Sequence, residues 1–135
     1  MDFILDCSVT MSWCFADELT LYSKKVRSSL EEYSALVPVL WKIEVSNCLY
    51  TAHKKNRISE AAEFYFLELL KELSIQVSSI QLQTSEILRI CKEHKLTAYD
   101  ACYFHLAITQ NLPLATLDKD LRHAVLKAGG KIYLE

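Results

Sequence analysis

The stretch Phe3-Ile4-Leu5-Asp6 decides the fold, because three consecutive large apolar residues end in an acid. Such a run is typical of a strand buried on both faces, as the strands of a parallel sheet are. Working outward from it, apolar runs of similar length predict further strands at residues 35–39, 75–79, 112–116 and 131–134.

Helical patterns separate these strands. Val45, Cys48, Leu49 and Ala52 recur at the i, i+3, i+4, i+7 spacing of one helix face. Other helices are predicted at residues 8–15 (capped by Ser8), around 24–32, and at 59–73, 87–95, 97–110 and 121–128. Strands that alternate with helices predict an α/β sandwich with a mostly parallel sheet.

Length and composition indicate one globular domain over residues 1–135. Apolar residues make up 51% and charged residues 24%, which excludes a disordered chain. Two glycines and two prolines are too few for a turn-rich β protein, and no linker or repeat divides the chain. The net charge of −2 excludes nucleic-acid binding by bulk positive charge, so such a role needs local charge or a bound cation.

The cysteines and the N-terminal residues predict a cytoplasmic protein. Five cysteines without a C-x-x-C pair suggest free thiols in a reducing compartment rather than disulfides or a zinc site. Asp2 and Asp6 do not fit the basic start of a secretory signal. The longest uncharged stretch, residues 101–117, contains too many polar residues for a membrane span.

Four acids are expected at one edge of the predicted sheet. Asp6 ends the first strand, and Asp118 follows the strand at 112–116. Glu44 and Asp100 are expected in the first turns of helices that follow strands. Ligands of open parallel sheets bind beyond the carboxyl ends of the strands.

Each acid also has a purely structural explanation. Asp100 fits a capping box with Thr97, Asp118 and Asp6 fit helix N-caps, and Glu44 suits a helix N-terminus. Together the four acids fit these explanations less well, because each like-charged pair at ~4 Å costs about 1 kcal/mol in water and about 4 near a protein surface. Protonation of some groups, or a bound divalent cation, relieves that repulsion. All-oxygen ligands favour Mg²⁺ or Mn²⁺ over zinc.

Other chemistries lack their motifs. The four histidines show no H-E-x-x-H spacing, and the two adjacent glycines provide neither a P-loop nor a G-x-G-x-x-G turn. No G-x-S-x-G elbow is present. Metal-assisted hydrolysis is therefore the best-supported class of reaction.

Four segments together resemble the PIN-domain ribonucleases, and in particular the VapC-like toxins of bacterial toxin–antitoxin pairs. They are Leu5-Asp6-Cys7-Ser8-Val9, Pro38-Val39-Leu40-Trp41-Lys42-Ile43-Glu44-Val45-Ser46-Asn47, Leu96-Thr97-Ala98-Tyr99-Asp100-Ala101-Cys102-Tyr103 and Leu114-Ala115-Thr116-Leu117-Asp118-Lys119-Asp120-Leu121. Their order and spacing extend the resemblance over nearly the whole chain.

The resemblance implies roles for particular residues. It makes Asp6, Glu44, Asp100 and Asp118 the catalytic acids and the ligands of Mg²⁺ or Mn²⁺. It gives supporting roles to the residues Ser8, Asn47, Thr116 and Asp120, the last of which is near enough to share or replace the role of Asp118.

The resemblance also implies a PIN-like three-layer sandwich with about five strands, a homodimer, and a metal-dependent endoribonuclease that a cognate antitoxin protein inhibits. The sequence leaves open which RNA is cleaved, whether one or two metals bind, and which antitoxin is the partner. A catalytically silent PIN-like binding module is the main alternative. A receiver-like phosphoacceptor fits less well, because Asp6 has no acidic neighbour after the first strand.

The predicted helix at 59–73 suggests a protein partner. Its large apolar residues spread over more of the helix than one core face can bury; they are Phe64, Tyr65, Phe66, Leu67, Leu69, Leu70 and Leu73. Exposed apolar surface of that extent marks an interaction site. In the resembling family, this region helps to form the groove for the antitoxin.

Overall fold

A computed structural model describes residues 2–135 and contains one parallel four-stranded sheet in the order β3-β2-β1-β4. The strands are β1 (Phe3–Leu5), β2 (Ala35–Val37), β3 (Ile75–Val77) and β4 (Leu114–Ala115). Every pairing is parallel. The predicted α/β class and mostly parallel sheet are confirmed.

The expected strand count of about five is slightly too high. Residues 131–134, predicted as a strand, contribute an isolated bridge between Ile132 and Leu114. The partner strand β4 is only two residues long. Leu134 also adopts a φ of 60°, in the left-handed region, which ends the extended run.

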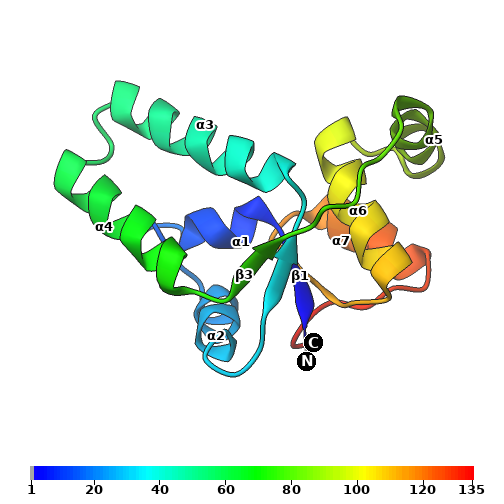
Figure 1. The fold of residues 1–135 in the computed structure, drawn as a ribbon, viewed down its shortest axis with the longest axis horizontal. Helices are drawn as coiled ribbons and strands as arrows, with labels where there is room; N and C mark the ends of the chain where they lie inside the picture. Colours follow the sequence, from blue (N-terminus) through cyan, green and yellow to red (C-terminus); the bar gives the residue numbers. More distant parts are fainter. Residues whose placement is uncertain (1) are drawn as a thin grey trace.

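Seven helices flank this sheet in residues 2–135. They are α1 (Cys7–Ser12), α2 (Leu21–Ser29), α3 (Leu40–Lys54), α4 (Glu60–Glu72), α5 (Thr84–His94), α6 (Ala98–Gln110) and α7 (Lys119–Lys127). Figure 1 shows α1 to α4 on one side of the sheet and α5 to α7 on the other. The molecule is therefore a three-layer sandwich.

The buried strand β1 is the centre of the core. Phe3, Ile4 and Leu5 are fully buried, as a central parallel strand requires. On one side, α1 packs against α3, where the Trp41 indole N–H donates to the Thr10 hydroxyl at 2.9 Å. On the other, α6 packs against β1 and buries Tyr103 completely.

The topology brings the carboxyl ends of the strands to one edge of the sheet. The Asp6 N–H donates to the Ala115 carbonyl at 3.0 Å, which continues the β1–β4 ladder by one residue. The residues that follow β1 and β4, Asp6 and Thr116, are therefore neighbours. All five cysteines are free in the structure.

Helix α4 is attached to the core through Phe66, its one fully buried residue, and through the partly buried Leu69 and Leu70. Phe64, Tyr65 and Leu67 are exposed, and Tyr65 is the most exposed at 72%. In Figure 1, α4 lies at the outer left of the molecule, beyond α1. None of the helices in residues 2–135 is both long and apolar enough to cross a membrane.

Candidate active site

Asp6 is a buried carboxylate held by two hydroxyl groups. The Ser8 and Thr116 hydroxyls each donate to Asp6 Oδ2 at 2.7 Å. Asp6 is the N-cap residue of α1, yet its side chain accepts no capping hydrogen bond. Burial raises the pKa of Asp6 although both hydroxyls favour its ionised form. Asp6 therefore occupies the N-cap position, but its side chain does not cap the helix, and the capping explanation is wrong.

The same two hydroxyls also fix the backbone that leads to Asp118. The Ser8 hydroxyl accepts from the Leu117 N–H, and the Thr116 hydroxyl accepts from the Asp118 N–H, both at 3.0 Å. Asp118 Oδ1 in turn caps α7 by accepting from the Leu121 N–H at 2.9 Å. The N-cap explanation for Asp118 is correct, and it occupies only one of the two carboxylate oxygens.

Glu44 lies in the second turn of α3. The expected position in the first turn is wrong, because the helix already begins at Leu40. The Tyr103 hydroxyl, from α6, donates to Glu44 Oε1 at 2.6 Å. Burial, together with the nearby charge of Asp6, raises the pKa of Glu44.

Asp100 has the least compensated carboxylate of the group. Its backbone N–H donates to the Thr97 hydroxyl at 3.1 Å, but the reciprocal side-chain bond of a capping box is not formed. Burial raises the pKa of Asp100 to about 7, and the charges of its acidic neighbours add to the effect; these are Asp118, Asp6, Glu44 and Asp120. The four predicted acids therefore lie close enough to repel one another.

No basic side chain in residues 2–135 lies within 4 Å of these acids. A cluster of carboxylates without a basic partner, in which the pKa values of Asp6, Glu44 and Asp100 are raised, suits a hard divalent cation, which prefers oxygen ligands. In the same part of the chain, no three potential ligands are gathered tightly enough to hold a metal ion as they stand. The donor set fits Mg²⁺ or Mn²⁺ by chemistry and charge, and a cation bound there would be held partly through water, several molecules of which Mg²⁺ usually keeps.

The two remaining supporting residues are exposed. Asn47 follows Glu44 by one turn on α3, and its side chain makes none of the hydrogen bonds found in the described residues. Asp120 lies in the first turn of α7, where its charge contributes to the raised pKa of Asp100.

Tyr103 is a residue of the site that the sequence analysis did not single out. Its ring occupies a fully buried core position. A buried tyrosine hydroxyl usually has a hydrogen-bond partner, and Tyr103 follows Asp100 by three residues on the same helix. That spacing is the available signal that the hydroxyl faces the acids.

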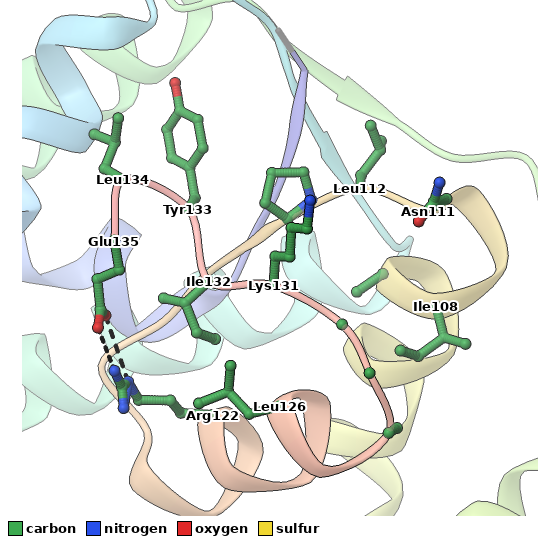
Figure 2. Close-up of a pocket in the computed structure, with 15 residues that line it drawn as sticks. Ile108, Asn111, Leu112, Arg122, Leu126, Lys131, Ile132, Tyr133, Leu134 and Glu135 are labelled. Atoms are coloured by element: carbon green, nitrogen blue, oxygen red, sulfur yellow. Dashed lines mark hydrogen bonds and ion pairs between the residues drawn. The ribbon is translucent and has the colours of Figure 1, made fainter.

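A cavity lies away from the four acids. It has a volume of about 740 Å³ and is lined by residues of α6 and α7 and by the last residues of the chain. Pro113, which precedes β4, also lines it. Figure 2 shows Arg122 and Glu135 paired at its rim. None of the four acids lines it, so the cavity and the acids lie at opposite ends of β4.

Comparisons with known proteins agree with this geometry. The family model of the PIN domain matches residues 3–126. The crystal structure of PAE2754 from Pyrobaculum aerophilum is similar, with a TM-score of 0.71 and 22% sequence identity over 92% of this chain and 84% of that one. The comparison with curated proteins finds no significant match. PIN domains are generally nucleases, and they typically use divalent metals. The chain belongs to the PIN domain family.

Proposed function

We propose that this protein is a Mg²⁺- or Mn²⁺-dependent endoribonuclease, formed by a single PIN domain over residues 1–135. The observation that supports it is the convergence of Asp6, Glu44, Asp100 and Asp118 without a basic partner. Family membership supports a nuclease, and the uncompensated charge supports a metal-dependent one.

In the proposed mechanism, the four acids hold the cation and their neighbours hold the acids. Ser8 and Thr116 orient Asp6 through Oδ2 and leave Oδ1 without a hydroxyl donor. Asp118 uses Oδ1 for the helix cap and keeps its second oxygen for the site. When bound, a divalent cation supplies a nucleophile from water near neutral pH and offsets charge on the phosphate. Asn47 and Asp120 offer polar side chains at the rim of the site.

Cleavage of RNA by the purified protein tests this function. The protein should cleave with Mg²⁺ or Mn²⁺, lose activity in EDTA and recover it when the cation is restored. Asp6→Asn serves as the inactive control for contaminating nucleases. Cleavage that continues in EDTA would contradict the proposal. RNA binding without cleavage by the wild type would favour the silent binding module instead.

The partner that we propose for the α4 surface is a cognate antitoxin. The protein would then be a toxin that acts on RNA. We further propose that it does so in the cytoplasm and as a homodimer. The support is the exposure of Phe64, Tyr65 and Leu67 on a helix that fully buries only Phe66. An arginine or lysine of the antitoxin that reached the acids would form charge-assisted hydrogen bonds with them and displace the metal.

Co-expression with the protein of the adjacent reading frame tests this partner. Tyr65→Glu should weaken the complex without unfolding the protein, because Tyr65 is 72% exposed. Leu88→Glu is the matched control, since Leu88 is an exposed apolar residue of α5 on the other side of the sheet. Equal binding by both variants and the wild type would exclude α4 as the docking surface.

A further inference from the structure

We propose that Tyr103 is a positioning residue that holds Glu44 in place for the metal. This inference rests on the proposed function, because it assigns a role within the same site. The residue lies outside the set of acids and hydroxyl groups that the resemblance identifies. The Tyr103 hydroxyl donates to Glu44 Oε1 at 2.6 Å, a short distance typical of a bond to a charged acceptor.

The hydrogen bond connects two helices that pack on different neighbours. Helix α3 packs on α1, whereas α6 packs on α5, α7 and β1. Asp100 and Tyr103 are both on α6, so the bond from Tyr103 to Glu44 links the position of Glu44 to that of Asp100. The separation of these two acids therefore depends on the tyrosine hydroxyl as well as on the helices.

The bond also decides which oxygen of Glu44 is available. Oε1 is engaged by the hydroxyl, and no hydrogen bond in residues 2–135 engages Oε2. A glutamate side chain has several rotatable bonds, and ordering it has an entropic cost. A carboxylate already held through one oxygen presents the other to a cation with less of that cost.

A second tyrosine in the molecule gives a contrast. Tyr22 donates to the Tyr133 carbonyl at 2.9 Å, so it joins α2 to the C-terminal segment and touches none of the acids. Its hydroxyl bonds only to backbone groups, the Tyr133 carbonyl and the Thr116 backbone, and to no carboxylate. The Tyr103 hydroxyl instead donates to a carboxylate of the site, while the Tyr103 ring is buried in the core.

The pair Tyr103→Phe and Tyr22→Phe separates positioning from stability. Each variant removes one hydroxyl and keeps the ring. Isothermal titration of Mn²⁺ into the protein should show about a 10–100-fold loss of affinity in Tyr103→Phe, as for other groups that orient metal ligands, and no change in Tyr22→Phe. RNA cleavage by Tyr103→Phe should fall in kcat at saturating RNA with KM unchanged. In the Glu44→Gln background, Tyr103→Phe should cause no further loss.

Equal Mn²⁺ affinity in Tyr103→Phe and the wild type would overturn the inference. Failure of the wild type to bind Mn²⁺ or cleave RNA would instead overturn the proposed function. A measurement on the wild type covers the case in which Tyr103→Phe does not fold. With ¹³C at tyrosine Cζ, the Tyr103 resonance should shift when Mg²⁺ is added while that of Tyr22 stays fixed, and an unmoved Tyr103 resonance would count against the role.

Discussion

The two ends of the parallel sheet differ in how their acidic side chains are paired with basic ones. At the amino end of β4 lies a cavity of about 740 Å³, and the opposite charges of Arg122 and Glu135 at its rim are paired. At the carboxyl end, Asp6 and Asp100 have raised pKa values and no cation within 4 Å among the described residues. Ionisable groups with perturbed pKa values cluster at functional sites. The comparison therefore supports the proposal that the active site lies at the carboxyl end.

The largest effect is expected from Asp100→Asn at the carboxyl end. RNA cleavage should fall on the order of 100-fold or more, because a proposed ligand of the cation that offsets charge in the transition state is lost. The fold should stay intact or become slightly more stable, since like-charge repulsion is relieved. Cleavage rates and urea unfolding measure the two effects.

Asp2→Asn is the matched control, because Asp2 precedes β1 at the opposite edge of the sheet and is exposed. It should leave cleavage unchanged. Equal losses of RNA cleavage in Asp2→Asn and Asp100→Asn would contradict the proposal that the active site lies at the carboxyl end of the sheet.

A smaller effect is expected from pH in the absence of divalent cations. Asp100 has a folded-state pKa of about 7 against an ordinary value of 3.8, so the folded state binds more protons between these values. Its contribution to the free energy of unfolding therefore falls as pH rises from about 4 to 7. The half-exposed carboxylate is screened by solvent, so the expected loss is on the order of 1 kcal/mol.

Urea unfolding in EDTA at pH 5 and pH 8 measures this effect. The wild type should lose more stability between the two conditions than Asp100→Asn does, and Mg²⁺ at pH 8 should restore it. An identical pH dependence in both proteins would contradict the raised pKa of Asp100.

The fold was predictable where local patterns determine it. Phe3-Ile4-Leu5 and the helical spacing around Val45 and Leu49 report burial directly, and the strands and helices follow from them. The end of the chain was less predictable. Residues 131–134 have the apolar pattern of a strand, but pairing depends on the length of β4, which is not encoded near them.

The grouping of the four acids was predictable, and the contacts that hold them were not. Asp6 and Asp118 follow strands, so topology alone brings them to one edge. The bond from Tyr103 to Glu44 joins residues 59 positions apart on helices that pack on different neighbours, and no local pattern specifies it. The position of Glu44 in the second turn was missed because a shift of one residue in the start of α3 moves Glu44 between the first and second turns. The ends of a helix are its least certain residues.

The smallest effect is expected from Arg122→Ala, at the amino end. Arg122 pairs with Glu135, but both side chains are more than 40% exposed. Exposed ion pairs contribute about 0–1 kcal/mol, so the free energy of unfolding should drop by no more than that, and Glu135→Gln should cost a similar amount. RNA cleavage should stay within about twofold of the wild type, because the Arg122 and Glu135 side chains pair with each other and line the cavity, which none of the four acids lines. Parallel urea unfolding and cleavage assays on both variants check this. A tenfold loss of cleavage in Arg122→Ala with stability unchanged would place a substrate contact at the cavity, and the functional difference between the two ends of the sheet would no longer hold.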